Sequence, residues 1–261
     1  MTEPVTIDRD GHVLLIGLNR PAKRNAFDLA MIDAFSAAYE RLGGDDAIHA
    51  GVVYGHGEHF SAGLDLVEVG PAVAERGPQV LAGDGRYDPF GLWRAPVPKP
   101  VVMAVNGVAF TLSIELALAA DIVVAADDVR FCQLEVGRGI LPFAGAALRA
   151  PIRLGWGNAM RFLLTADEFD ADQARHIGLV QDVVAAGRHV ARAVEIAQAI
   201  ASQAPLGVQA TLANARLAHA AAERAAVAHL RSVLPGILAS EDAAEGVCSF
   251  IERRPGRFTG R

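Results

Sequence analysis

The chain has 261 residues, of which 52% are hydrophobic and 21% are charged, a balance that is typical of a compact globular protein and not of a disordered or fibrous one. Its formal net charge of −6 argues against a nucleic acid as its partner. The two cysteines, Cys132 and Cys248, form no metal or disulfide motif, so we expect a reducing, cytoplasmic location.

The first part of the chain predicts strands separated by a helix. The N-terminal residues MTEPVTIDRD lack the basic and apolar regions of a secretory signal peptide. Residues 13–18, VLLIGL, are predicted to form a strand that pairs with residues 5–8 through a turn at Asp10 and Gly11. A helix is predicted from Asp28 to the Gly43-Gly44 pair, because apolar residues recur there at steps of three and four. Residues 50–55 predict another strand.

The middle of the chain begins with residues 68–98, whose five glycines and five prolines predict a mobile loop or lid that could include one short helix. After it we expect a turn at Asn106-Gly107 and a helix over 111–120, with strands over 101–105, 122–125 and 129–132. The most apolar span, residues 101–126, contains Glu115 and Asp121, which are costly to insert into lipid. We therefore interpret this span as buried core and expect no membrane association.

The last part of the chain is predicted to be mainly helical. Helices are expected over 143–154, 156–164 and from Asp170 to Gly178, followed by a strand over 179–184. Residues 188–253 are rich in alanine and predict helices that are broken at Pro205 and Pro235. This change in composition marks a C-terminal helical segment from about residue 200, whereas strand, strand, helix recurs loosely before it, as in a repeated unit.

Residues 100–145 place two acids, Glu115 and Glu135, among apolar neighbours. A buried carboxylate without a partner is costly. Two carboxyls that met in one dry pocket would have raised or split pKa values, so that one could donate a proton while the other accepts one. Alternatively each acid is structural, with Glu135 paired to Arg138 and Glu115 bonded to a distant arginine or backbone amide. The local sequence leaves both interpretations open.

Two segments that follow predicted strands offer backbone N–H groups. We expect FSAGLDL, residues 60–66, to turn into a helix at Gly63, and residues 111–115 to begin another. Unpaired N–H groups at two such helix starts would form an oxyanion hole if they converged, and otherwise they are ordinary helix starts. Ser61 is disfavoured as a nucleophile, because His59 stands where a G-x-S-x-G elbow needs glycine.

Other charged or polar groups give weaker signals. His56 and His59 have no partner motif for a metal and are interpreted as surface histidines. No P-loop or G-x-G-x-x-G motif follows a strand, which argues against nucleotide hydrolysis and dinucleotide redox chemistry. Basic residues gather in two places, where they could hold a phosphorylated ligand or be solvated charges: Arg20, Lys23 and Arg24, and Arg253, Arg254, Arg257 and Arg261.

Six segments, taken together and in this order, carry a family resemblance: NRPAKRNAF, FSAGLDL, KPVVMAVNGVAF, IELALAADIVVAADDVRF, QLEVGRGILPFAG and LTADEFDADQARHIGLV. Through them the chain resembles the crotonase, or enoyl-CoA hydratase/isomerase, superfamily over nearly its whole length. The resemblance implies an α/β fold, a crotonase-like spiral of repeated ββα units with a C-terminal helical trimerisation region. Residues 1–199 would form the spiral core with the acyl-CoA site and residues 200–261 the helical extension, in a homotrimer or dimer of trimers.

The resemblance also implies a site. Glu115 and Glu135 match the two carboxylates of the hydratases, where Glu115 would chiefly activate water and Glu135 would chiefly give a proton. The backbone amides of Leu64 and Leu112 match the oxyanion-hole donors. No metal or cofactor is implied, because coenzyme A is part of the substrate. Six residues are expected to contact the acyl-CoA: Lys23, Arg24, Ala62, Asp65, Leu66 and Phe143.

The chain departs from the family pattern close to these residues. Thr111, Leu112 and Ser113 replace a glycine run, and the Leu112 side chain would narrow the pocket. Phe143 replaces a glycine, so its ring would take space near Glu135. The expected activity is hydration of a 2-enoyl-CoA thioester. The alternatives are double-bond isomerisation, hydrolysis of the thioester, and a non-catalytic protein that binds acyl-CoA.

Overall fold

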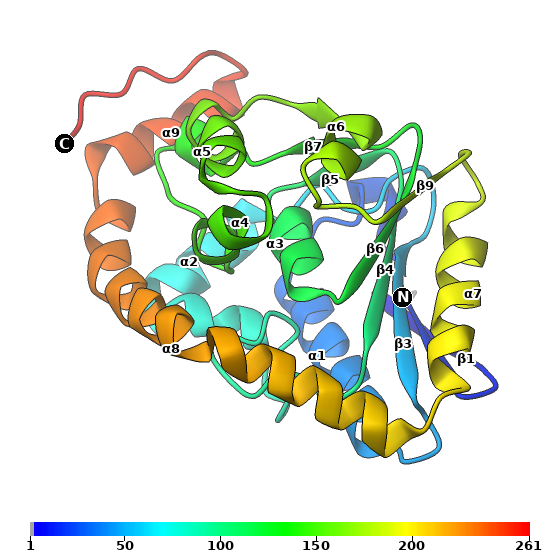
Figure 1. Cartoon of the computed structure of the whole chain (residues 1–261). Helices are drawn as coiled ribbons and strands as arrows, with labels where there is room; N and C mark the ends of the chain where they lie inside the picture. Colours follow the sequence, from blue (N-terminus) through cyan, green and yellow to red (C-terminus); the bar gives the residue numbers. More distant parts are fainter. Residues whose placement is uncertain (1–2) are drawn as a thin grey trace.

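The structure, a computed structural model, describes residues 3–261, without the side chains of residues 218–223, 225 and 226 (Figure 1). Its larger sheet has six strands in the order β1-β2-β3-β4-β6-β9. Strands β1 and β2 form the predicted antiparallel hairpin, and the other neighbouring pairs in this sheet are parallel. The strands span Val5–Asp10 (β1), Val13–Leu18 (β2), Ala50–Gly55 (β3), Val101–Val105 (β4), Ile122–Ala126 (β6) and Asp182–Val184 (β9).

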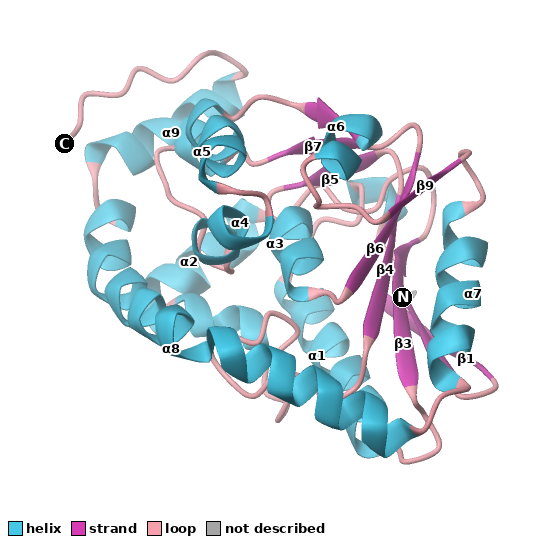
Figure 2. Ribbon diagram, viewed as in Figure 1, coloured by secondary structure: helices cyan, strands magenta, loops and turns pink. Residues whose placement is uncertain are grey.

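A smaller sheet of three short strands lies beyond one end of the larger one (Figure 2). It contains Val108–Phe110 (β5), Arg130–Cys132 (β7) and Phe169–Asp170 (β8). Strand β5 starts directly after the turn at Asn106-Gly107, and β7 pairs with it in parallel. The chain runs from β4 through β5 into α3. The smaller sheet therefore sets the direction in which α3 starts.

Helices cover both faces of the larger sheet (Figure 2). On one face lies α7, and α1 and α3 lie on the other. The described helices span Leu29–Gly44 (α1), Leu66–Arg76 (α2), Leu112–Ala119 (α3), Ala146–Arg153 (α4), Trp156–Thr165 (α5), Ala171–His176 (α6), His189–Ala201 (α7), Pro205–Leu238 (α8) and Glu241–Glu252 (α9), with 3₁₀ turns at Pro21–Lys23 (η1), Pro78–Ala82 (η2) and Glu135–Arg138 (η3).

The central strands are buried on both faces, and this explains their unbroken apolar sequences. Successive side chains of a strand point to opposite faces. Val53 and Met103 therefore join the core under α1 and α3, whereas Val52 and Val102 pack with Ala197 of α7. The N-terminus of α1 is fixed by its N-cap Asp28, whose side chain accepts the Met31 N–H at 2.8 Å.

Several predicted boundaries are wrong. Helix α2 begins at Leu66 and not at Gly63, because Gly63 has φ +98° and Leu64 pairs as an extended residue with Phe27. The part of α2 that lies within residues 68–98, up to Arg76, is the one short helix that the prediction for this segment allowed. Strand β5 was not predicted, because three residues show no periodicity.

Two further predictions fail in the helical part of the chain. Helix α4 begins at Ala146, after Gly145 at φ +121°, instead of at residue 143. Pro235 does not break α8, which runs through it to Leu238. The break predicted at Pro205 is confirmed, because α8 starts there.

The last helix, α9, packs back against the body of the molecule at η3. Helix α8 runs along one side of the molecule, and α9 packs against η3 (Figure 1). The boundary predicted near residue 200 falls between α7 and α8, and the role of the later helices in oligomerisation stays a prediction. Within the described part of the chain, no helix is both long and apolar enough to cross a membrane.

Candidate active site

Glu115 lies in the first turn of α3 and is 2% exposed. Its Oε1 accepts the N–H groups of Ala144, at 2.8 Å, and Ala146, at 3.1 Å. These donors belong to the segment that starts α4, where unpaired N–H groups favour a negative charge. Burial nevertheless raises the pKa of Glu115 to about 7, although these N–H groups and the charge of Arg149 lower it.

Glu135 opens η3 and is also buried. Its Oε1 accepts a hydrogen bond from Gln133 Nε2 at 2.9 Å, whereas its Oε2 meets no hydrogen-bond partner among the described residues. Among the described residues, Glu135 forms no ion pair with Arg138, the structural alternative that the sequence left open, and the charge of Arg138 is not among the causes that shift the pKa of Glu135. The Arg138 guanidinium lies 4.9 Å from the ring centroid of Phe250. Burial and then the charge of Glu115 raise the pKa of Glu135 well above its usual range.

The structure therefore brings the two carboxyls into one buried region. They come from separate elements, α3 and η3, and each lacks a counter-ion strong enough to offset its burial. Two interacting acids in such a place titrate as a pair and keep one proton between them over a range of pH. One protonated and one ionised carboxyl can give and take a proton on the same small molecule.

The segment before α2 runs beside the segment that leads into α3. The Ser61 N–H donates to Val108 O at 3.0 Å, and the Phe110 N–H donates to Ser61 O at 3.0 Å. Ser113 Oγ also donates to Ser61 O. Gly63 is in close contact with Thr111, because a Cβ at Gly63 would lie 1.8 Å from Thr111 Oγ1. This contact brings the peptide groups of Leu64 and Leu112 to the same region.

The N–H groups of Leu64 and Leu112 have no hydrogen-bond acceptor that the structure records among the described residues. Leu112 is the first residue of α3, where an N–H has no partner within the helix. Beside Leu64, the Gly63 carbonyl and the Asp65 N–H are both bonded to Phe27 at 2.8 Å. Thr111, which precedes Leu112, has φ 49° and ψ −109°, a region that a β-branched residue rarely adopts. Such strain at a non-glycine residue is typical of functional sites.

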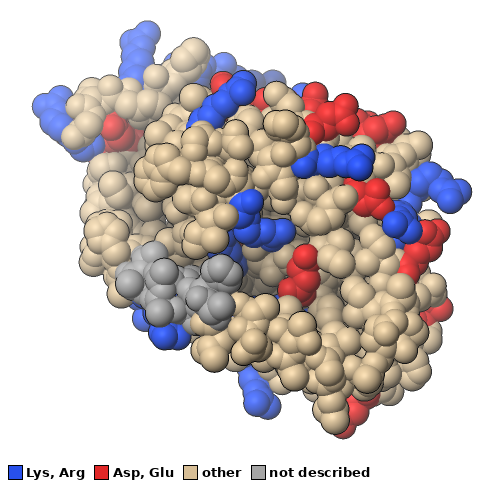
Figure 3. All heavy atoms as spheres, in the orientation of Figure 1, with Lys and Arg blue, Asp and Glu red and all other residues tan. Residues whose placement is uncertain are grey.

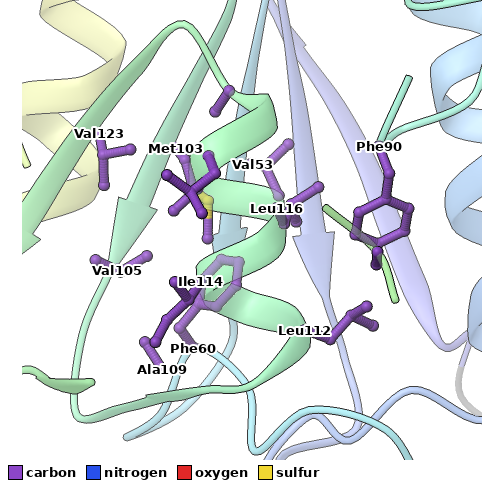
Figure 4. Close-up of a cluster of buried hydrophobic side chains, with 14 of the residues drawn as sticks. Val53, Phe60, Phe90, Met103, Val105, Ala109, Leu112, Ile114, Leu116 and Val123 are labelled. Carbon is purple, nitrogen blue, oxygen red and sulfur yellow. The ribbon is translucent and has the colours of Figure 1, made fainter. Parts of the chain in front are cut away.

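The two large side chains that replace family glycines are part of the hydrophobic core. Leu112 is 2% exposed and lies on the same side of α3 as Phe90, whereas Ile114 lies on the other side with Phe60 (Figure 4). Phe143 is 4% exposed and belongs to the same core. The predicted narrowing of the pocket by these residues stays a prediction.

Comparisons with known proteins show the family of the chain. The family model described as "Enoyl-CoA hydratase/isomerase" matches residues 8–261. The chain is 34% identical to a 2,3-dehydroadipyl-CoA hydratase of Escherichia coli over 98% of both chains. It is also 34% identical to a carnitinyl-CoA dehydratase of Salmonella typhi over the full length of both. The chain belongs to the enoyl-CoA hydratase/isomerase family.

A solved structure supports the fold of this family member. The chain is 49% identical to a probable enoyl-CoA hydratase/isomerase from Mycobacterium abscessus, with a TM-score of 0.81 over 99% of both chains. The expected crotonase fold, an α/β spiral with a mostly parallel sheet, is thereby confirmed.

The residues predicted to bind the CoA group lie along two adjacent loops of this family member. Lys23 and Arg24 are exposed, and the Arg24 carbonyl accepts the Ala62 N–H at 2.9 Å. Asp65 precedes α2 and lies 3.6 Å from Arg20 in an ion pair, and Leu66 is half-buried as the first residue of α2. The two loops thus place five of the predicted residues near Leu64, and the sixth, Phe143, lies in the segment before α4. The contacts of all six with CoA stay predictions.

Other polar residues have structural partners. Ser61 is buried and its Oγ donates to Asn25 O at 2.8 Å, so the hydroxyl holds the two loops together. His56 Nε2 lies 2.7 Å from Thr6 Oγ1, and His59 Nδ1 accepts the Val108 N–H at 3.2 Å. Both histidines are half-buried and are not the surface residues that the sequence predicted.

Sequence reasoning missed two side chains that act on the pair of acids. Gln133 donates to Glu135, and its position two residues earlier in the chain was the only available signal. Arg149 is one turn into α4, and its charge lowers the pKa of Glu115. Its role depends on how α4 meets α3, which no local pattern reveals.

Proposed function

We propose that this family member is an enoyl-CoA hydratase that adds water across the C2=C3 bond of a 2-enoyl-CoA thioester. The observation that carries the proposal is the pair of buried carboxyls, Glu115 and Glu135: burial raises the pKa of both, and the charge of Glu115 raises the pKa of Glu135 further. Two carboxyls that share a proton suit a reaction that takes one proton from water and gives one to carbon. The names of two relatives, a hydratase and a dehydratase, describe the same type of reaction in either direction.

In this proposal the N–H groups of Leu64 and Leu112 hold the thioester oxygen. Ionised Glu115 takes a proton from water while the water oxygen bonds to C3, and the electrons of the double bond move through C2 to the thioester oxygen. Charge develops on that oxygen, where fixed N–H donors stabilise it most. Protonated Glu135 then gives its proton to C2 as the carbonyl re-forms, so one proton enters the pair and one leaves. The chemistry proposed here uses no further cofactor.

The proposal includes assembly into a homotrimer or a dimer of trimers. Several large apolar side chains of α8 and α9 are exposed, which is typical of surfaces that pack against another chain. They include Leu206 at 80%, Leu217 at 69% and Ile251 at 66% exposure. Light scattering on the purified chain tests this, and a monomer at micromolar concentration would contradict it.

The decisive experiment for the activity is to mix the protein with crotonyl-CoA and longer 2-enoyl-CoAs and to follow the absorbance of the conjugated thioester. We expect the absorbance to fall, because hydration removes the conjugation. The variant E135Q should bind the same thioesters without changing their absorbance. Tight binding by the unaltered protein with no loss of absorbance would instead identify a non-catalytic acyl-CoA binding protein, and turnover by E135Q would contradict the assignment of the proton donor.

A further inference from the structure

A large cleft separates α8 from the body of the molecule. It has a volume of about 1250 Å³ and lies between α8, the loop of residues 88–98, the end of α3 and one side of α4. Figure 3 shows this face hollowed at its centre, with basic and acidic atoms at the edge of the hollow. Sites for small molecules usually occupy about 300 to 1,000 Å³, so the cleft can hold an acyl chain.

The cleft adjoins the pair of acids without containing them. Arg149 lines the cleft, and its charge also lowers the pKa of Glu115. Leu118 and Ala119 line it as well, and they follow Glu115 by three and four residues, which places them on the same face of α3. With a rise of 1.5 Å per residue, Leu118 and Ala119 lie roughly 4.5 and 6 Å along the helix from Glu115.

The lining combines apolar side chains with an excess of positive charge. The described residues that line the cleft include six arginines and two aspartates, although the whole chain has a net charge of −6. Both aspartates are satisfied by their own surroundings: Asp88 accepts backbone N–H groups of the loop that follows it, and Asp121 accepts the Val101 N–H and pairs with Arg216 at 3.2 Å. Among the described lining residues the positive charges outnumber the negative ones, which favours a positive potential inside the cleft.

Two of the lining arginines, Arg94 and Arg231, are the ones to consider as partners for a charged ligand. Arg153 donates to three carbonyls at the end of α3 and is structural. Arg231 of α8 lies with its guanidinium 5.0 Å from the ring centroid of Trp93. Arg94, on the same loop as Trp93, donates from one guanidinium nitrogen to the Gly85 carbonyl at 2.5 Å. Its other terminal nitrogen lies 4.0 Å from Asp84, and because Asp84 is fully exposed this ion pair is screened by solvent.

From these observations we infer that the cleft receives the acyl part of the substrate and favours acyl groups that end in a carboxylate or a similar anionic group. The inference rests on the proposed function for the identity of the thioester. Its apolar walls accept the methylene chain beyond C3, and Arg94 and Arg231 bind the anionic end. A neutral methyl end gains nothing from these charges.

The inference is tested by binding, so that it does not depend on turnover. The probes are hexanoyl-CoA and the six-carbon thioester of the same length that ends in a carboxylate, both saturated and unreactive. Calorimetry on the full chain gives the ratio of their dissociation constants. We expect the carboxylate-ended thioester to bind roughly fivefold to tenfold more tightly at low salt, which is the combined contribution of a few partly exposed charge pairs. The difference should shrink as salt is added.

Charge-altering variants locate the effect. R231E and R94Q should each lower the ratio, and the double variant should remove it, because each takes away charge that meets the anionic end. A ratio measured on one variant cancels any general loss of folded protein. R175Q is the matched control, since Arg175 is exposed on α6 and does not line the cleft. Equal binding of the two probes, or a preference that survives R231E and R94Q together, would overturn the inference, while loss of the enoyl-CoA absorbance tests the hydratase proposal separately.

Discussion

Glu135 has one carboxylate oxygen bonded to Gln133 and a second that meets no hydrogen-bond partner among the described residues. An unsatisfied buried oxygen is expensive, and it costs less when the carboxyl carries a proton. Glu115, in contrast, accepts two backbone N–H groups that favour its ionised form. In the proposed reaction, these surroundings suit Glu135 to act as the acid and Glu115 to act as the base.

This division predicts the pH dependence of catalysis. Protonation of Glu115, with its pKa of about 7, should lower kcat/KM as the pH falls through that value. Ionisation of Glu135 should lower it at a higher pH, because burial and the charge of Glu115 raise its pKa. The measurement is kcat/KM for crotonyl-CoA against pH. A profile that is flat between about pH 5 and pH 8 would show that neither carboxyl acts as assigned.

Removal of the Gln133 amide gives a second prediction at this scale. The hydrogen bond from Gln133 lowers the pKa of Glu135, so the substitution Gln133→Leu should move the alkaline limb of the profile to higher pH. It should also slow turnover about tenfold, because Oε1 then loses its donor as well. Slower turnover with an unmoved alkaline limb would mean that Gln133 acts only through general packing.

The two acids could be predicted from the sequence, because carboxyls among apolar residues stand out and their order matches a known family. Gln133 could not, since an amide becomes important only when the chain direction aims it at a carboxyl. The strain at Thr111 was also hidden. The sequence shows that Thr111 stands where the family pattern has a glycine. It does not show that this threonine keeps a glycine-like backbone conformation.

At the scale of elements, α9 is closely fitted to the turn that carries Glu135. A Cβ at Gly246 of α9 would lie 1.9 Å from the Arg138 carbonyl oxygen in η3. Because the obstacle is backbone, the turn would have to move. The last helix of the chain therefore takes part in fixing the position of the proposed proton donor.

Gly246→Ala should accordingly lower the free energy of unfolding by about 2 kcal/mol and reduce kcat. The matched control is Gly236→Ala in α8, where nothing lies within 4 Å of an added Cβ and the helix should gain roughly 0.5–1 kcal/mol. Denaturant unfolding and steady-state kinetics measure both effects. Equal behaviour of the two variants would contradict the fit between α9 and η3.

Elements with strong local sequence signals were predicted correctly, whereas elements with weak or misleading signals were not. The hairpin of β1 and β2 and helix α1 follow from a turn dipeptide, an N-cap aspartate and clear periodicity. The start of α2 was misplaced because Gly63 permits an extended pairing with the loop before α1. Pro235 was misleading because α8 continues through it despite the lost hydrogen bond.

For the molecule as a whole, burial of the Glu115 carboxyl lowers the free energy of unfolding at neutral pH. Glu115 has a folded-state pKa above its unfolded value of 4.5, so the folded state holds its proton more tightly. Its contribution is most favourable below the unfolded pKa and is lost as the pH rises to about 7. The raised pKa of Glu115 therefore lowers the stability of the fold at neutral pH.

The variant Glu115→Gln should therefore be more stable than the unaltered protein at pH 8, by up to about 3 kcal/mol, because the amide carries no charge and its oxygen can still accept two N–H groups. The advantage should shrink at pH 5, where the unaltered carboxyl is protonated in the folded state. Urea unfolding at the two pH values measures it. A variant that is less stable at both would show that Glu115 is a structural group.

The central claim is that Glu115 and Glu135 act together on one substrate. The most direct test is kcat for crotonyl-CoA with E115Q, E135Q and the double variant. If the two acids work as a unit, each single variant should lose most of the activity and the double variant should lose little more. Losses that multiply in the double variant, or a single variant that keeps its activity, would contradict the claim.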